Sequence, residues 1–500
     1  MKKVFPLFLI TLFALVGCDH PVGPAGNTDK SELIKTEDVV ITETDDGDTW
    51  LSDNYYGTTG GEFDEYEFHA QPGTTSDFDS YLDPFDAGPG VTILSPQQAE
   101  PQPQYAQQQG QRQRGQGQGG QGGQGQRRQG QERPNRPQFT PEQAAKFPAI
   151  EGPPRIFYNL PESLHNPDGL TVSEDGQTLY MCNPNFNGRE NDEGPKKYGG
   201  FLVSFDLQSR RPQQMEVLLE FPPLAETGQF GCMGLDFGPD GHLYVCDNQY
   251  FFNTDHKSRI VRVQMDGKKP TGKIEIVATG MKLANAVMWM DDKMLVTDTF
   301  LDLEGKWGSG GIWAFTKDEA LKAGSGVNPP ITLKPNGADP HLVAIAEVTN
   351  IGRGDNAGAD GMTCTPDGVV YFGNFGDGAM YRVVFDANLK ATVEVIHKAG
   401  EFFSCCDGIF YDQRTDKIYI NDSEKNAILA FKPIKAGEKP KYEVIWENGD
   451  TDGTGGLLDQ PAELVVVGRR MIICNFDWPF PGLLNSKFDA PYTMSVITLK

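Results

Sequence analysis

The sequence predicts an all-β fold, a six-bladed β-propeller closed by its N-terminal strand, and three observations lead to this prediction. Residues 151–500 consist of short apolar runs separated by Gly, Asp, Asn and Pro, which is typical of antiparallel strands joined by tight turns. The runs recur in six copies, spaced like four-stranded blades with loop insertions. One unmatched apolar run precedes the first copy and can complete the last one.

The six copies share one pattern, in which a lead residue opens a first apolar run and a turn brings the chain back in a second run. Successive lead residues are about 65, 52, 75, 47 and 56 residues apart. The first runs are Asp168-Gly-Leu-Thr-Val, Met233-Gly-Leu-Asp-Phe, Asn285-Ala-Val-Met-Trp, Asp360-Gly-Met-Thr-Cys, Asp407-Gly-Ile-Phe-Tyr and Glu463-Leu-Val-Val-Val. Because the innermost strands of a propeller run in the same direction, we expect all lead residues near one mouth of the channel.

The third and fourth runs of the first five copies complete their blades. The sixth copy has only ELVVV, MIICN and SVITLK, so its last strand would expose an unpaired edge. The run Arg155–Leu160 precedes all the copies and is predicted to pair there. The third runs are FLVSFDL, RIVRVQM, GIWAFT, MYRVVF and AILAF, and the fourth runs are EVLLEF, KIEIVAT, LVAIAEV, ATVEVIH and YEVIW.

The N-terminus resembles a bacterial lipoprotein signal peptide, predicted over residues 1–17. Lys2 and Lys3 precede an apolar run that is too short to span a bilayer. Leu-Val-Gly-Cys18 resembles a lipobox, so we expect Cys18 to be lipidated and the protein to be anchored in the bacterial cell envelope, either periplasmic or surface-exposed. An ordinary cleaved signal with an incidental cysteine is the alternative.

Two segments without a hydrophobic period separate the signal from the propeller. Residues 18–95 are rich in Asp and Glu and are predicted to form an acidic disordered tether. Residues 96–150 are rich in Gln, Gly and Arg and are predicted to be a linker, because they have too few apolar side chains to offset the entropy of ordering.

The charge of the chain excludes one class of partner. Its 69 Asp and Glu against 44 Lys and Arg give a net charge of -25, which argues against nucleic acid and leaves room for a cation. Eight cysteines are too few for a disulfide scaffold, and lipidation of Cys18 would leave an odd number. A disulfide among Cys182, Cys246 and Cys474 stays open.

Residues 153–500 resemble the regucalcin/gluconolactonase family, also called senescence marker protein, and more distantly the paraoxonases. The best local match is Ala359-Asp360-Gly361-Met362 with TPDGVVYFGNFGDGAMYRV. Both families are six-bladed propellers that bind a divalent cation in the channel mouth. Carried over in blade order, the resemblance implies a metal site at Asp168, Asn285, Asp360 and Asp407, to which Glu463 adds a carboxylate that the family does not normally use.

Two of these positions depart from the family pattern. Asp168 stands where the family has Glu, and Asp360 stands where it has Asn, although every donor remains an oxygen. The Arg-x-Asn-Asp-Gly segment of gluconolactonases is absent, so the resemblance does not identify the substrate.

A separate physical argument also predicts a cation. Several carboxylates that converge in a channel of low dielectric repel one another and raise their pKa values unless a cation holds them together. Oxygen donors without sulfur select Ca²⁺ or another hard divalent cation. The alternative is that each Asp-Gly only shapes the turn that enters a strand.

The sequence leaves two functions open. One is a Ca²⁺-dependent hydrolase of lactones or esters, with Asp407 or Asp360 as the catalytic general base. The other is a non-enzymatic surface propeller that binds a protein or a glycan around a structural metal. In either case we expect a monomer, attached to the membrane through its lipid anchor.

Overall fold

The structure is a computed structural model. The predicted signal peptide, Cys18 and most of the predicted tether and linker lie outside the residues that it describes. Those residues are 41–42, 139–186, 199–209, 214–290, 292–303, 306–334, 339–348, 356–480 and 482–500. Neither helix in these ranges is long and apolar enough to cross a membrane.

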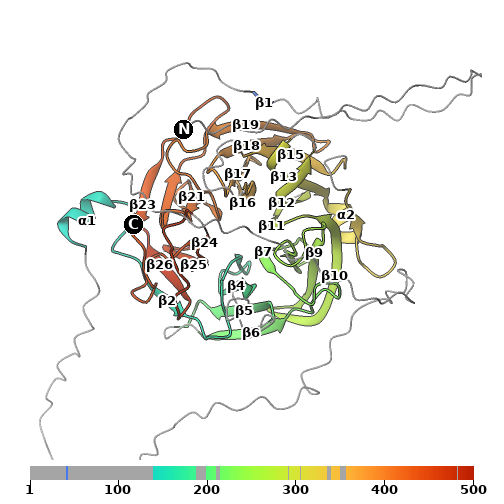
Figure 1. Ribbon diagram of the computed structural model, residues 1–500, viewed down its shortest axis with the longest axis horizontal. Coiled ribbons are helices and arrows are strands. Elements are labelled where there is room, and N and C mark those ends of the chain that lie inside the picture. Colours follow the sequence, from blue (N-terminus) through green and yellow to red (C-terminus); the bar gives the residue numbers. More distant parts are fainter. Residues whose placement is uncertain are drawn as a thin grey trace, which may run out of the picture. The chain divides into compact units, whose positions relative to one another are not determined.

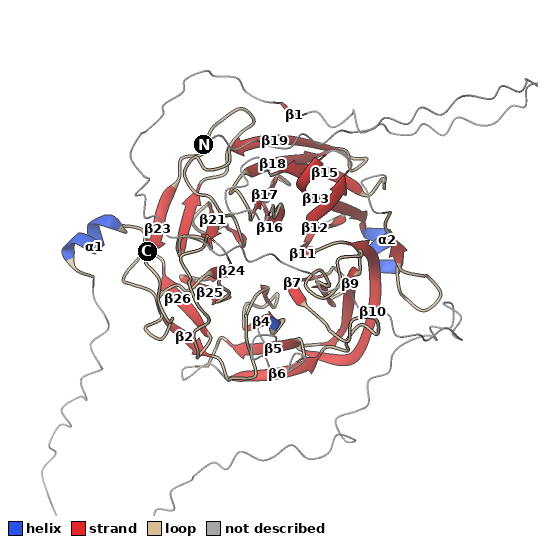
Figure 2. Cartoon of the chain, viewed as in Figure 1, coloured by secondary structure: helices blue, strands red, loops and turns tan. Residues whose placement is uncertain are grey.

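Six antiparallel sheets surround a common centre, which confirms the predicted all-β propeller (Figures 1 and 2). Blade 1 contains β3 (Leu170–Val172), β4 (Thr178–Asn183), β5 (Phe201–Asp206) and β6 (Met215–Glu220), and blade 2 contains β7 (Cys232–Phe237), β8 (Leu243–Asp247), β9 (Ser258–Asp266) and β10 (Lys269–Met281). Blade 3 contains β11 (Ala284–Met290), β12 (Lys293–Leu303), β13 (Lys306–Thr316) and β15 (Leu342–Glu347), and blade 4 contains β16 (Ala359–Cys364), β17 (Val370–Asn374), β18 (Met380–Phe385) and β19 (Ala391–His397). Blade 5 contains β20 (Ile409–Asp412), β21 (Lys417–Asp422), β22 (Ala427–Phe431) and β23 (Glu443–Glu447), and blade 6 contains β24 (Pro461–Val467), β25 (Arg470–Asn475), β26 (Thr493–Thr498) and β2 (Arg155–Asn159).

The N-terminal strand closes the ring as predicted. β2 pairs in antiparallel register with β26, from Arg155 opposite Val496 to Asn159 opposite Thr493. The last blade therefore has four strands, of which one comes from the other end of the propeller sequence.

The packed structure begins before residue 151, the predicted start of the propeller. Helix α1 (Pro141–Lys146) is capped by Thr140, and the chain after it buries Phe147 and Ile150 against blades 5 and 6. Phe147 lies against Trp446, with ring centroids 4.7 Å apart. These side chains therefore belong to the core, although composition alone assigned them to the linker.

Three short elements add to the blades. β14 (Ile331–Thr332) pairs in parallel with β10, and β1 (Ile41–Thr42) pairs in parallel with β19. Helix α2 (Lys317–Lys322) follows β13 and begins with a capping box at Thr316.

The core is divided among the blade interfaces. Each of the six clusters of buried apolar residues lies mainly between two neighbouring blades. Between blades 1 and 2, for example, Tyr180 and Leu202 pack with Leu243 and Val261. Each blade is therefore stabilised by both of its neighbours, as expected for a closed ring.

The glycine that follows most lead residues permits close packing of the innermost strands. A Cβ atom on Gly361 would lie 2.1 Å from the carbonyl oxygen of Asp407, and one on Gly169 would lie 2.3 Å from that of Met233. Gly234 and Gly408 have the same relation to the carbonyl oxygens of Asn285 and Ala462. The repeated glycine therefore has a steric reason of its own and leaves the preceding acid to be explained separately.

Candidate functional site

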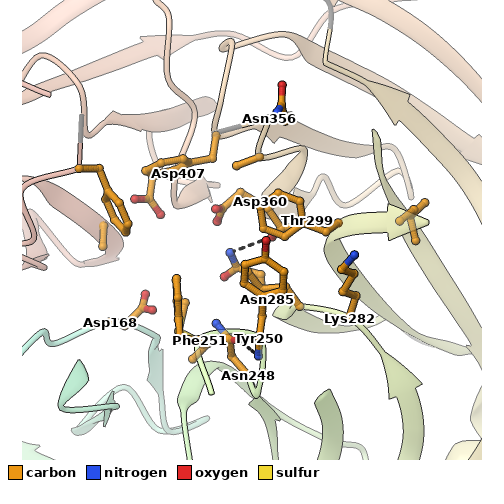
Figure 3. Close-up of a pocket in the computed structure, with 18 of the residues that line it drawn as sticks. Asp168, Asn248, Tyr250, Phe251, Lys282, Asn285, Thr299, Asn356, Asp360 and Asp407 are labelled. Carbon is orange, nitrogen blue, oxygen red and sulfur yellow. Dashed lines mark hydrogen bonds between the residues drawn. The ribbon is translucent and has the colours of Figure 1, made fainter. Parts of the chain in front are cut away.

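Five of the six lead residues line one cavity of about 600 Å³ at the centre of the ring (Figure 3). The innermost strands bring them there because each strand begins at the same end of its blade. Apolar Met233 occupies the blade 2 position, as the sequence indicated. The other four are Asp168, Asn285, Asp360 and Asp407.

Backbone hydrogen bonds to the second strand of each blade fix the backbone positions of these acids. The Asp168 amide donates to the Cys182 carbonyl at 3.0 Å, and the Asp407 amide donates to the Asn421 carbonyl at 3.0 Å. The pairing places Asp168 and Asp407 two residues before β3 and β20, the innermost strands of their blades. The carboxylates of Asp168, Asp360 and Asp407 point toward the same central space (Figure 3).

Burial and mutual repulsion dominate the electrostatics of this site. Asp168 and Asp360 are each only 6% exposed. Burial raises the pKa of Asp168 well above its usual value, and the charge of Asp407 raises it further. Burial likewise raises the pKa of Asp360, as do the charges of Asp407, Asp168 and Glu463, whereas a hydrogen bond from Asn285 lowers it. The carboxylates therefore act on one another across the channel.

Two hydrogen bonds orient members of the site. The Asn285 side-chain amide donates to Thr299 Oγ1 at 3.2 Å. Ser423 Oγ donates to Asp407 Oδ2 at 2.7 Å, and the same hydroxyl lies 2.6 Å from the Pro461 carbonyl. Ser423 thus connects the Asp407 carboxylate with the start of blade 6.

Glu463 has a different position from the other predicted ligands. It is half-buried and does not line the cavity, and its Oε1 accepts a hydrogen bond from the Leu464 amide at 2.8 Å. Burial raises the pKa of Glu463 well above its usual value, and the charges of Asp168 and Asp407 add to this. Its carboxylate therefore contributes to the field of the site without lining the cavity.

Asn248 on blade 2 also lines the cavity, in the blade that lacks a lead acid. Its Oδ1 accepts a hydrogen bond from the Tyr250 amide at 2.9 Å, which fixes the orientation of the side-chain amide. Its Nδ2 is buried and has no hydrogen-bond partner. The Asn248 side chain therefore offers an unused amide donor beside the acids (Figure 3), and Gln460 Nε2 is a second buried donor without a partner in the lining.

Six aromatic residues also line the cavity, five of them from loops and Phe300 from β12. Lys282 also lines the cavity, but its ammonium is ion-paired with Asp302. No histidine lines the described part of the wall, so proton transfer there would depend on the carboxylates. The aromatic lining residues are Tyr250, Phe251, Phe300, Phe375, Phe476 and Phe480.

The donor atoms of this site suit a hard cation. The distances between its acids, however, are too long for them to hold a metal ion by themselves. Its carboxylates and the Asn285 amide offer only oxygen to a metal, as Ca²⁺ requires. In the part of the chain that the structure describes, however, no three His, Cys, Asp or Glu side chains are placed to hold a metal ion by themselves. A cation here would have to draw the acids together and complete its shell with water.

The cysteines are not paired in this structure. Cys182, Cys246 and Cys474 are buried at equivalent ends of second strands, and no disulfide joins any of the cysteines that the structure describes. Burial raises the pKa of all three thiols, so they are poor nucleophiles.

No protein-family model and no curated protein sequence matches the chain. Among solved structures it is similar to a PQQ-bound aldose sugar dehydrogenase from Streptomyces coelicolor, with 13% identity over 69% of this chain and 98% of that one and a TM-score of 0.44. A gluconolactonase from Xanthomonas campestris shows 11% identity over 70% and 96%, with a TM-score of 0.38. The calcium-binding protein regucalcin from Agrobacterium tumefaciens shows 14% over 69% and 94%, with a TM-score of 0.40. The structural neighbours thus include gluconolactonase and regucalcin, as the resemblance indicated, and the likeness describes the fold.

Proposed function

We propose that this chain is an exported, lipid-anchored hydrolase of lactones or esters that depends on Ca²⁺ or another divalent cation. One observation carries the proposal: buried carboxylates from separate blades face one cavity, and their charges raise one another's pKa values. Such an arrangement is costly for folding unless a cation occupies it, and perturbed acids in a cavity are typical of functional sites.

Residues from four blades would hold the cation. Asp168, Asn285, Asp360 and Asp407 supply oxygen donors from blades 1, 3, 4 and 5, and Glu463 adds negative charge from blade 6. A bound divalent cation would polarise the substrate carbonyl and stabilise negative charge on its oxygen.

The residues of the chain itself would perform the remaining steps. The unused Asn248 N–H can donate to a substrate oxygen and orient the carbonyl. Asp407 or Asp360 would accept a proton from the attacking water as its oxygen bonds to the carbonyl carbon. The same acid would return that proton to the leaving oxygen as the ring or ester C–O bond breaks.

The aromatic wall favours a substrate with an apolar part. Phe251, Phe476 and Phe480 line the cavity together, whereas Lys282 is held by Asp302 and offers no unpaired charge. A lactone or ester with an alkyl or aryl group would bury that group against these rings. Within this class we expect lower KM values for alkyl or aryl substrates than for polyhydroxylated sugar lactones.

A second candidate is a glycan-binding surface propeller with a structural metal. Trp478 and Phe480 stack with centroids 5.6 Å apart, and Phe476 lies parallel to Phe480 at 6.5 Å. Flat aromatic faces of this kind also suit sugar rings. This function would require tight glycan binding without turnover.

Assays of the chain without its signal peptide and lipid separate these functions. The proposal predicts hydrolysis of at least one substrate class among alkyl and aryl esters, homoserine lactones and aldonolactones, with loss of activity in EDTA and recovery with Ca²⁺. No hydrolysis of the whole panel with Ca²⁺ present would contradict it, and glycan binding in the same samples would favour the second candidate.

Calorimetric Ca²⁺ titration tests the site directly. Asp360→Ala removes a donor and a charge and should weaken binding at the cavity at least about tenfold, which corresponds to about 1.4 kcal/mol. Asp360→Asn keeps an oxygen donor and should weaken it less. The matched control is Asp367→Ala, in the turn between β16 and β17, where Asp367 accepts a hydrogen bond from Thr365. Equal affinity for Asp360→Ala and the parent chain would refute the metal site.

A further inference from the structure

A second group of acids lies beside blade 6, outside the cavity. These acids form the blade 6 acidic cluster. They come from two loops, one before β24 and one between β25 and β26. Lys487, which is mostly exposed, pairs with Asp489 of this cluster at 2.8 Å. The cluster contains Asp450, Asp452, Asp459, Asp477 and Asp489.

Two of these acids are almost completely buried. Asp459 is 2% exposed and Asp477 is 1% exposed. Burial raises the pKa of Asp459 to about 8, and the charge of Asp477 is its next largest cause. Burial also raises the pKa of Asp477 to about 7, with repulsion from Asp489 and Asp450 adding to it. The loops that carry these two acids are in contact, because the Phe476 amide donates to the Gln460 carbonyl at 2.8 Å.

Two buried side-chain oxygens in these loops have no hydrogen-bond partner. Asp459 Oδ1 is buried and has no hydrogen-bond partner. The Asn485 side chain, 1% exposed, donates its amide to Asp477 Oδ1 at 3.0 Å, while its own Oδ1 is also buried without a partner. Both oxygens are acceptors, and a buried acceptor without a partner is destabilising unless a ligand occupies it.

We propose that the blade 6 acidic cluster binds a divalent cation, Ca²⁺ in preference to Mg²⁺, through Asp459, Asp477 and the Asn485 side-chain oxygen. Two carboxylates and one amide oxygen are fewer donors than Ca²⁺ uses, so water and backbone carbonyls complete the shell. Ca²⁺ accepts such an irregular mixed shell, whereas Mg²⁺ demands a near-octahedral one.

The cation would stabilise one wall of the cavity. Asp459 precedes Gln460, and Asp477 follows Phe476, and both Gln460 and Phe476 line the cavity. Gln460 also accepts a hydrogen bond from the Trp478 amide, so the two loops already contact each other. A cation held between them would fix this wall whether or not the cavity is catalytic.

Terbium luminescence tests the proposal, because Tb³⁺ occupies Ca²⁺ sites and emits when a nearby indole is excited. The background is the full chain carrying Asp360→Ala, so that the cavity site is weakened. We expect Trp-sensitised Tb³⁺ emission that Ca²⁺ displaces. Trp478→Phe should remove most of the emission without changing Ca²⁺ affinity by calorimetry.

Asp459→Asn is the decisive variant, since it keeps the shape of the side chain and removes its charge. It should weaken Tb³⁺ and Ca²⁺ binding about tenfold or more and remove the Ca²⁺-induced rise in melting temperature on this background. Asp318→Asn removes the same charge from exposed α2 and should change neither. A melting transition as cooperative as that of the parent shows that Asp459→Asn is folded.

Two outcomes would overturn the proposal. Unchanged Tb³⁺ and Ca²⁺ binding in Asp459→Asn would place the cation elsewhere. No binding with Ca²⁺ raised to about 10 mM, above the roughly 10⁻⁴–10⁻³ M of weak extracellular sites, would mean that the cluster holds only water. An absence of hydrolysis would contradict the proposed function of the cavity. It would not change the Tb³⁺ and Ca²⁺ binding measurements that test this cluster.

Discussion

At the scale of single residues, polar side chains on the innermost strands connect one blade with the next. Asp236 on β7 accepts a hydrogen bond from the Trp289 amide on β11 at 2.8 Å, and Thr363 on β16 accepts one from the Tyr411 amide on β20 at 3.0 Å. Asp236 also accepts a bond from the Phe237 amide at 2.8 Å. Two different residue types thus make the same link between neighbouring blades.

The Asp236 link should make stability depend on pH. Burial raises the pKa of Asp236 to about 6, although both amide hydrogen bonds lower it. Because the folded pKa exceeds the unfolded value, the stability that this group contributes is complete below about pH 4 and is lost as the pH rises through about 6. The rise in the pKa of Asp236 corresponds to a change of at most roughly 3 kcal/mol in the free energy of unfolding.

Urea unfolding of the parent chain and Asp236→Asn between pH 4.5 and about 7.5 measures this effect. The variant loses one acceptor and should be less stable at low pH, but its free energy of unfolding should fall less steeply with pH. Identical slopes for the two chains would show that Asp236 ionises normally in the folded state.

At the scale of elements, one buried arginine attaches helix α2 to the propeller. Arg262 on β9 is 3% exposed, and its Nε donates to Glu275 Oε2 on β10 at 2.8 Å. Its guanidinium also donates to the Leu321 carbonyl at 2.8 Å and to the Ala323 carbonyl at 3.3 Å. It therefore satisfies carbonyls at the C-terminal end of α2, where helices leave them unpaired.

Replacing Arg262 should be among the most destabilising changes in the chain. Arg262→Met leaves Glu275 buried without its main partner and should lower the free energy of unfolding by about 3–5 kcal/mol. Lys273→Met removes the half-exposed second partner of the same glutamate and should cost less than about 1 kcal/mol. Chemical denaturation of both variants measures these changes. Similar decreases in the free energy of unfolding would mean that burial of the arginine is unimportant.

At the scale of the whole molecule, the propeller is stabilised by closing its ring. β2 covers the edge of β26, and Phe147 and Ile150 before it pack in the core between blades 5 and 6. Without this segment blade 6 would keep three strands and expose both a strand edge and an apolar surface. Since every blade rests on its two neighbours, damage at this junction should spread around the ring.

Two truncated chains test the closure. A chain that starts at Phe139 keeps α1 and β2 and should melt close to the full-length protein. A chain that starts at Ser163 should melt well below it or aggregate, as followed by circular dichroism and light scattering. Equal solubility and melting temperature for the two would contradict closure by β2.

The sequence alone determined the architecture, because the signals for it are local and repeated. Alternating apolar runs and turn residues recur in six copies, so the four strands of each blade, the blade order and the closing role of residues 155–160 could all be predicted. The gathering of Asp168, Asn285, Asp360 and Asp407 could be predicted in the same way, since equivalent positions in a repeat lie at equivalent places in the ring.

Only the tertiary structure decided what surrounds those residues, since the contacts join segments far apart in the chain. Three features depend on loops without a repeated pattern. They are the Asn248 donor, the aromatic residues Phe476 and Phe480 in the cavity wall, and the position of Glu463 outside the cavity lining. The same holds for Asp459 and Asp477, which read in sequence as ordinary acids in polar loops. Burial and repulsion exist only once those loops pack together, and no local pattern encodes that packing.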